Sequence, residues 1–506
     1  MSVELTALLT PQWRQTWDEI PWAEESDRPD PYFFTFVMKA SDLRKVSGVF
    51  RRNPLAGESR QADDAVQRPH EETRSRQIRR FVDTGYPMSD MTEAQRGAAG
   101  KEYLRPGWLP TAVVVNILTA GETREGRSPL SEGSAFTATL RATDPPGSPI
   151  TLSSQFPIDS RSDAETPAFE VIDGQHRLWA FESDDSTDDY YLPVVAFYNL
   201  SKTNQAYLFW SINIKPKRIN TSLAFDLYPI LRSQEWLMGD ESLKVYRESR
   251  AQELTEALWS SLASPWYDRI NMIGSTGVGD TQPVTQASFV RTLMSSFVKK
   301  WDAPRFVAGG LFGNSDKGGL DWNRAQQAAY LITSWKYLVD AIPQEGHVWY
   351  QEFERYLGSR PEILARTTLL GSDQGVRAYM SVLNEISFNL VDDYKLRDWR
   401  TKDVTGENLA EDINIALDSL YGHPASDLLA NVATAVSSFD WRGQKGVPDG
   451  SERDSRKSYL GSGGYVRLRS DIYKAIVSHG RGDVVRISQS LLERHEQEAR
   501  EREQRK

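Results

Sequence analysis

One stretch in the first half of the chain, residues 169–180, constrains the fold more than any other. It reads Phe-Glu-Val-Ile-Asp-Gly-Gln-His-Arg-Leu-Trp-Ala, which is an apolar run, an Asp-Gly break and three polar side chains. This pattern predicts a strand that ends in a tight turn and leads into a helix. The free backbone N–H groups at the start of such a helix favour anions, phosphate above all.

Three residues of this stretch suit a phosphate site. Gly174 would let the backbone come close to a ligand, and Arg177 offers a fork-shaped donor that matches phosphate oxygens. His176 follows in the same turn. The pattern leaves open a plain turn, in which His176 is a surface residue and Arg177 a solvated charge.

The five residues Asp173 to Arg177 resemble the signature of the DGQHR-domain family. That family includes DndB-type proteins of DNA phosphorothioate systems and DpdB-type proteins of DNA 7-deazaguanine systems. The spacing Gly174-x-x-Arg177-x-x-Ala180 also resembles the Gly-x-x-Arg-x-x-Ala box of ParB-like and sulfiredoxin-like folds. Because the chain has no cysteine, sulfiredoxin chemistry is excluded and only fold and nucleotide binding carry over.

Length and charge set wider limits. A chain of 506 residues has room for two or three domains. The net charge of −10 argues against a basic surface for indiscriminate DNA binding, but it allows a local basic groove. We find no apolar run near ~20 residues and no signal peptide, and we therefore expect a cytoplasmic protein without membrane contact.

The resemblance and the patterning together predict an α/β domain with a ParB/sulfiredoxin-like mixed sheet, followed by a mainly α-helical domain. Residues 1–30 are expected to form a helix and a linker, because apolar residues recur at helical spacing over residues 4–20. Residues 31–235 would form the ParB-like DGQHR domain, with a β-rich insertion at about 120–166. Residues 236–506 would form the helical domain.

A helix over residues 71–84 carries a second candidate group. Arg76 and Arg80 are i,i+4 neighbours there, and Gly85 ends the helix. Strands are expected at residues 32–38, 108–118 and 192–198. An arginine-bearing helix before an apolar strand resembles the first box of ParB-like domains; a solvated helix face is the alternative.

The segment 209–223 resembles another hallmark of the family, a Phe-x-x-Ile-Asn sequence followed by a basic turn. It contains Asn213 and the cationic residues Lys215, Lys217 and Arg218 around a proline. These cations would form a compact site for phosphates of nucleotide or DNA. Exposed charge without a ligand is the alternative.

The resemblance implies roles for these residues. Asp173, Gln175, His176 and Arg177 would form a catalytic group, with Asp173 orienting His176 or binding a metal. Gly174, Arg76, Arg80 and Asn213 would hold nucleotide phosphate, and Lys215, Lys217 and Arg218 would contact DNA. The cofactor would be ATP or CTP, and Mg²⁺ could accompany it, although no dedicated metal site is expected from the scattered histidines.

The function that the resemblance implies is that of a nucleotide- and DNA-binding protein of a DNA-modification system. It would act as an ATPase with the modification enzymes of the same operon, or regulate them. Two alternatives stay open: a non-catalytic DNA-binding repressor of the modification genes, and a nuclease component of a defence island.

Overall fold

The computed structural model divides the chain into two compact units, residues 1–218 and 219–506. We call them the sheet unit and the helical unit and describe each by itself. The boundary falls between Arg218 and Ile219, earlier than the predicted boundary at residue 235. The structure describes residues 2–22, 28–50, 71–98, 100–124, 126–139, 147–160, 162, 164–181, 190–214, 220–227, 244–299, 308–313, 319–401, 404, 408–448, 450–461, 463–480 and 482–504.

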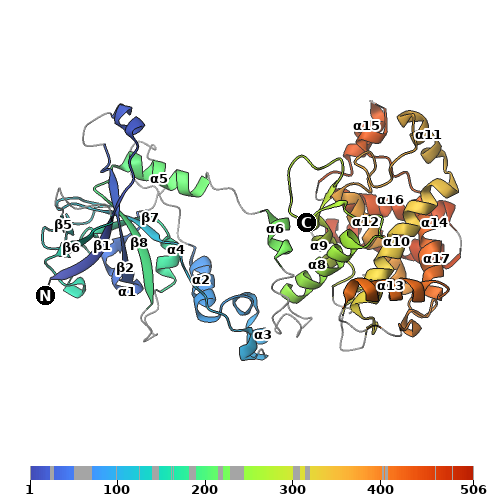
Figure 1. Ribbon diagram of the computed structural model, residues 1–506, viewed down its shortest axis with the longest axis horizontal. Coiled ribbons are helices and arrows are strands. Elements are labelled where there is room, and N and C mark those ends of the chain that lie inside the picture. Colours follow the sequence, from blue (N-terminus) through green and yellow to red (C-terminus); the bar gives the residue numbers. More distant parts are fainter. Residues whose placement is uncertain are drawn as a thin grey trace. The chain divides into compact units, whose positions relative to one another are not determined.

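A mixed β-sheet forms the centre of the sheet unit (Figure 1), so the predicted order of an α/β unit before a mainly helical unit is confirmed. The described residues form eight strands in the order β3-β7-β4-β8-β2-β1-β6-β5. The pairs β3–β7 and β4–β8 are parallel, and the other neighbours are antiparallel. The strands are β1 (Val3–Pro11), β2 (Tyr32–Lys39), β3 (Ser47–Gly48), β4 (Val113–Ile117), β5 (Thr137–Thr139), β6 (Pro149–Ser154), β7 (Phe169–Asp173) and β8 (Tyr191–Tyr198).

The N-terminal segment is a strand, so the helix predicted over residues 4–20 is wrong for its first half. Leu5, Leu8 and Leu9 fit a helical spacing, but Val3, Leu5, Ala7 and Leu9 also alternate with more exposed residues. Ala7 is fully buried, whereas Leu8 is 48% exposed, as a strand requires. Pairing with β2 on one side and β6 on the other fixes the extended form. Only a short 3₁₀ turn follows, at Gln15–Glu19.

The insertion at about 120–166 is β-rich, as predicted, and contains β5 and β6. β5 pairs with β6, and β6 also pairs with β1, so the insertion extends the main sheet at its edge. The strands predicted at 32–38, 108–118 and 192–198 correspond to β2, β4 and β8.

Strand β7, which leads into the signature, is buried along most of its length. Phe169 and Val171 belong to the hydrophobic core, together with Phe36 and Phe136. The ring of Phe169 lies 4.9 Å from that of Phe136. Because neighbouring residues of a strand point to opposite faces, Glu170 lies on the other side of the sheet.

Short helices cover the sheet. α2 packs against α4, and Gly85 ends α2 with a positive φ of 65°, as its sequence predicted. α5 packs against β7. The described helices of this unit are α1 (Ala40–Val46), α2 (Glu72–Thr84), α3 (Glu93–Ala98), α4 (Gln175–Trp179) and α5 (Lys202–Ile214).

The helical unit contains one small two-stranded parallel sheet, β9 (Ile270–Asn271) with β10 (Val284–Thr285), among its described residues. The apolar periodicity of the sequence predicts helices in this unit at residues 253–262, 284–298, 322–342, 349–357, 374–388, 427–439, 465–477 and from about 484. The structure has helices in all these places, and α13 and α15 are two that the sequence did not predict. No described helix of the chain has the length and apolarity needed to cross a membrane. The helices are α6 (Thr221–Asp226), α8 (Lys244–Ser260), α9 (Gln286–Ser295), α10 (Arg324–Glu345), α11 (Val348–Leu357), α12 (Asp373–Asn389), α13 (Leu409–Leu420), α14 (Pro424–Ser437), α15 (Ser451–Lys457), α16 (Gly464–His479) and α17 (Gly482–Gln504).

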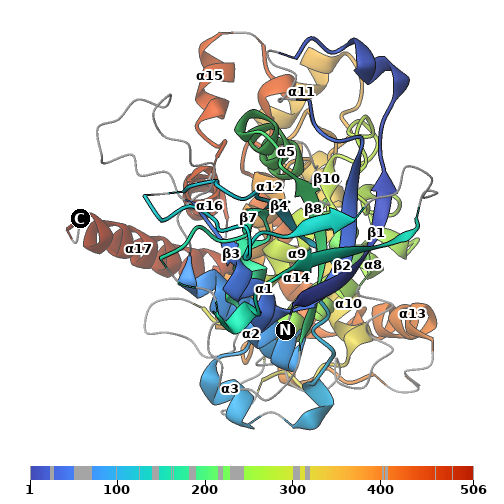
Figure 2. The same cartoon turned by 90° about the vertical axis from the view of Figure 1, so that its left-hand side faces the viewer.

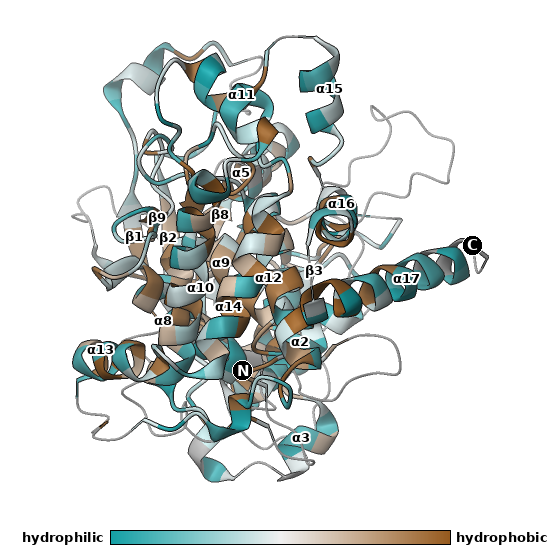
Figure 3. Cartoon of the chain, turned by 90° about the vertical axis from the view of Figure 1, so that its right-hand side faces the viewer, coloured by the Kyte–Doolittle hydropathy of each residue, from teal (hydrophilic) through white to brown (hydrophobic). Residues whose placement is uncertain are grey.

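Aromatic side chains form the core of the helical unit, where hydrophobic residues gather on α10, α12 and α14 (Figure 3). Trp266 and Trp335 are fully buried and meet edge to face at 5.2 Å. Trp335 also contacts Tyr379 of α12 at 4.6 Å. Such ring pairs fix the helix packing, and the distal half of α17 is hydrophilic by contrast (Figure 3).

A buried carboxylate joins three helices of this unit. Glu385 of α12 is 3% exposed and accepts hydrogen bonds from Arg469 at 2.8 Å and from Tyr473 at 2.7 Å, both on α16. His495 of α17 places Nε2 2.8 Å from the same carboxylate, and its Nδ1 lies 3.2 Å from Arg469. Because a guanidinium can only donate, Nδ1 accepts and Nε2–H donates to Glu385.

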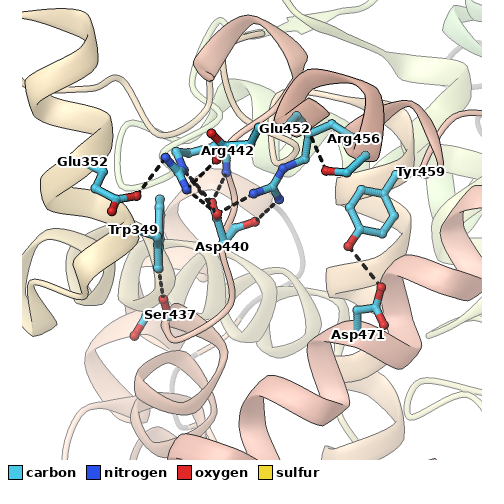
Figure 4. Close-up of polar contacts among 10 residues, drawn as sticks. Trp349, Glu352, Ser437, Asp440, Arg442, Glu452, Arg456, Tyr459 and Asp471 are labelled. Atoms are coloured by element: carbon cyan, nitrogen blue, oxygen red, sulfur yellow. Dashed lines mark hydrogen bonds and ion pairs between the residues drawn. The ribbon is translucent and has the colours of Figure 1, made fainter. Parts of the chain in front are cut away.

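A second ion cluster lies near α11 and α15 (Figure 4). Arg442, whose side chain is 8% exposed, contacts Asp440 at 2.8 Å, Glu452 at 2.9 Å and Glu352 at 3.2 Å. Arg456 also pairs with Asp440. Burial raises the pKa of Asp440, but the two arginines outweigh that effect and lower it. The cluster therefore attaches α11 and α15 to the segment that follows α14.

Candidate functional site

The signature lies where β7 ends. Asp173 is the last residue of the strand, and Gly174 follows with φ 95° and ψ 11°, a left-handed conformation. Gln175 then begins α4. The predicted strand, turn and helix are thus present, but α4 has five residues and its dipole is correspondingly small.

Glycine is required at position 174 for two reasons. Its positive φ is unfavourable for any residue with a Cβ atom. A Cβ built there would also lie 2.9 Å from Nη2 of Arg177 and 3.2 Å from the Cα atom of Val113. The glycine therefore lets the arginine fold back against β4, which differs from the predicted approach of a ligand.

Arg177 and Asp173 form an ion pair across one helical turn. Nη2 of Arg177 lies 2.9 Å from Oδ2 of Asp173 and also donates to the carbonyl oxygen of Ala112 at 2.9 Å. Both charged side chains are more than three-quarters buried. Asp173 thus orients Arg177, and the role predicted for Asp173 beside His176 stays a prediction.

In the signature, Oε1 of Gln175 and Nε of Arg177 are buried and have no hydrogen-bond partner among the described residues. Gln175 is 7% exposed. Leaving such a group unsatisfied costs about 1–3 kcal/mol. His176 lies between these two residues on α4 and is partly exposed.

The predicted arginines of α2 are brought near the signature only in part, although α2 packs on α4. Arg76 is exposed and forms an ion pair with Glu72 at 3.4 Å. Arg80 is partly exposed. Arg79 makes the contact that the prediction missed: its guanidinium lies 5.4 Å from the ring centre of Phe181, just after α4.

Asn213 does not join this site. Its side chain is exposed and donates to the carbonyl oxygen of Phe209 within α5 at 2.9 Å. Figures 1 and 2 show α5 and α2 at opposite ends of the sheet unit, while α5 packs against β7, the strand that leads into the signature. Lys215, Lys217 and Arg218 lie outside the described residues.

A buried polar network behind β7 was not predicted. Nε and Nη2 of Arg124 each lie 3.1 Å from Oε2 of Glu170, which also accepts from Gln205 at 3.4 Å. Arg124 and Glu170 are 9% and 8% exposed. Burial lowers the pKa of Arg124, but Glu170 and Glu122 more than offset this and raise it. This network attaches the insertion and α5 to the strand that carries the signature.

Comparisons of the chain with protein-family models, with curated proteins and with solved structures found no match. Within the described part of the chain, no group of three or more histidine, aspartate or glutamate side chains could hold a metal ion. The site is therefore defined by its own geometry: an Asp–Arg pair, a glycine with positive φ, and the unsatisfied buried atoms of Gln175 and Arg177.

Proposed function

We propose that the chain is a nucleotide- and DNA-binding protein of a DNA-modification system, with its nucleotide site at the signature Asp173 to Arg177. The resemblance to the DGQHR-domain family supports the system, and the order of elements supports a ParB-like fold for the sheet unit. An arginine-bearing helix, α2, precedes β4, and the strand next to β4 ends at the signature. Helix α2 also packs against α4, the helix that begins in the signature.

The observation that carries the proposal is the unsatisfied pair in the signature. Nε of Arg177 is a donor that needs an acceptor, and Oε1 of Gln175 is an acceptor that needs a donor. A nucleotide supplies both, because its phosphate oxygens accept and its ribose hydroxyl or base amino groups donate. Both atoms are covered, so binding requires a local movement of the short helix α4.

The ion pair with Asp173 sets what the site can do. The carboxylate holds Arg177 close to the turn, and phosphate binding would shift that guanidinium from carboxylate to phosphate or share it between them. Because Asp173 is paired with Arg177, a Mg²⁺ ion that accompanies the nucleotide would be held mainly by the phosphates. ATP or CTP binding is therefore the core of the proposal, and hydrolysis is tested separately.

The nucleotide site is tested by titrating the full-length protein with fluorescent ATP and CTP and by measuring phosphate release. Arg177→Ala and Gln175→Leu should each weaken nucleotide binding at least tenfold. Arg28→Ala is the matched control, because it removes another arginine–aspartate pair of the sheet unit, which is exposed and joins Arg28 to Asp18 at 2.8 Å. Wild-type protein that binds neither nucleotide would refute the site.

DNA binding is tested by the salt dependence of affinity. Replacing Lys215 and Lys217 with alanine should weaken binding and reduce the slope of log K against log salt, because fewer counterions are released. An unchanged slope would remove this segment from the DNA site. Nicking of supercoiled plasmid that is abolished by EDTA would instead support the nuclease alternative.

A non-catalytic repressor is favoured by one observation of its own. Arg177 donates to Asp173 and to the carbonyl oxygen of Ala112, so its contacts lie within the fold. Such contacts are expected if the signature has a purely structural role. If the chain is such a repressor, Arg177→Ala lowers the melting temperature. The affinity for DNA, with and without nucleotide, then stays that of the wild type. Loss of nucleotide binding at an unchanged melting temperature supports the nucleotide site instead.

A further inference from the structure

Helix α5 has one face on the sheet and another in solvent. Gln205 marks the inner face: it is 3% exposed and donates to the carbonyl oxygen of Leu200 at 3.0 Å and to Glu170. Tyr207 and Trp210 are 67% and 44% exposed. With 3.6 residues per turn, these two rings lie about 60° apart around the helix axis and well away from Gln205.

Two adjacent aromatic rings on a solvent face are unusual. Aromatic side chains carry large contact areas, and folding normally buries them. Thr203 and Asn213, which are also exposed, flank Tyr207 and Trp210 along α5. We call these four residues the α5 outer face. Its composition is that of a binding surface with planar apolar groups at its centre and polar groups at its ends.

The charged residues in the sequence around α5 indicate the kind of partner. Residues 190–225 contain no aspartate or glutamate, although the chain has 70 acidic residues and a net charge of −10. The same stretch contains Lys202 at the start of α5 and Lys215, Lys217 and Arg218 directly after its end. A basic stretch that contains exposed rings matches a polyanion with planar groups.

We propose that the α5 outer face binds single-stranded DNA, with unpaired bases stacked on Tyr207 and Trp210. This inference rests on the DNA binding in the proposed function and specifies its substrate. Stacking requires unpaired bases, because the faces of paired bases are already covered by their neighbours in the duplex. The rings accept any base, so little sequence preference is expected.

The test uses full-length protein and a fluorescein-labelled thymidine oligonucleotide, followed by fluorescence anisotropy. Tyr207→Ala and Trp210→Ala should each raise the Kd about tenfold without changing the salt slope, since neither removes a charge. Trp210→Phe should bind within about threefold of wild type because it keeps a ring. Tyr421→Ala, which removes an aromatic ring that is 84% exposed in the helical unit, is the control and should bind like wild type.

A crosslinking experiment covers the case in which a variant fails to fold. Wild-type protein is irradiated with an oligonucleotide that contains 5-iododeoxyuridine, and the attached peptide is identified by mass spectrometry. Attachment at Tyr207 or Trp210 supports the proposal. Attachment only at other parts of the chain overturns it.

The remaining outcomes separate this inference from the proposed function. Protein that binds duplex but not the single strand overturns the inference and leaves the DNA-binding function standing. Protein that binds neither form refutes the DNA part of the proposed function and the inference with it. If the alanine variants bind the single strand as wild type does but convert a dimer into a monomer, the α5 outer face is a protein interface and the inference is wrong.

Discussion

Glu385→Gln should destabilise the helical unit strongly, because it removes the one negative charge shared by Arg469, Tyr473 and His495. Burial alone raises the pKa of Glu385, but these partners lower it from 4.5 to about 2. At about 1.36 kcal/mol per pKa unit, the environment favours the charged form by about 3 kcal/mol. Loss of one partner from a buried ion pair typically costs about 3–5 kcal/mol, which agrees with this value.

The effect should depend on pH in one direction. A carboxylate whose pKa is lowered by folding stabilises the protein above its unfolded pKa, and this stabilisation is lost as the pH falls. The contribution of Glu385 is therefore complete at pH 7, begins to fall near pH 4.5 and disappears near pH 2. Wild type and Glu385→Gln should differ most at neutral pH and converge in acid.

Urea unfolding followed by tryptophan fluorescence measures the difference, since six tryptophans of the helical unit are buried in the described structure: Trp266, Trp322, Trp335, Trp349, Trp399 and Trp441. Glu496→Gln on α17 is the control, because Glu496 is exposed and its pair with Arg500 spans 3.9 Å. The control should change the free energy of unfolding by less than about 0.5 kcal/mol. A difference below about 1 kcal/mol for Glu385→Gln at pH 7, or one that does not shrink between pH 7 and pH 2, would refute the reasoning.

Three further substitutions test the sheet unit by thermal and urea unfolding. Gly174→Ala should destabilise it by about 1–3 kcal/mol. The loss should exceed that of Gly121→Ala, because Gly121 has a similar φ of 89° but no atom within 4 Å of an added Cβ. Equal losses would contradict the contact between position 174 and Arg177. Arg124→Met should cost about 3–5 kcal/mol because it leaves the carboxylate of Glu170 buried, and adding Glu170→Gln should recover part of the loss; no recovery would contradict the pairing. Gln175→Met should leave the free energy of unfolding unchanged or raise it by about 1 kcal/mol, since an unsatisfied amide is removed, and it should weaken nucleotide binding. A clear loss of stability would show that Gln175 has a structural partner.

The local elements of the sheet unit could be predicted where the pattern allowed one interpretation. Gly85 ends α2 as predicted, and the apolar run of β4 is buried. The helix predicted at the N-terminus was wrong because the spacing of Leu5 and Leu9 fits both a helix and a strand. Only pairing with β2 and β6 decides between the two. α15 was missed for a related reason, since ion pairs to Asp440 hold it in place rather than an apolar face.

The charged networks could not be predicted, because their members are far apart in the chain. Glu170 interrupts the apolar sequence of its strand. Its partner, Arg124, lies 46 residues earlier in the chain. Glu385 meets Arg469 and His495 across 84 and 110 residues. No local spacing relates such positions. Each pair forms because a buried charge must find an opposite charge, and the fold decides which one is near.

The signature itself now divides into two parts. Asp173, Gly174 and Nη2 of Arg177 are explained by the fold, because the glycine admits the arginine and the aspartate binds it. Gln175 is not explained in this way: it is 7% exposed, and its Oε1 has no partner among the described residues. A structural position under no other demand would favour an apolar side chain there, since burying an unsatisfied amide is unfavourable. The glutamine is therefore the residue of the signature whose presence argues most directly for the proposed nucleotide, which would offer a hydrogen-bond donor to Oε1.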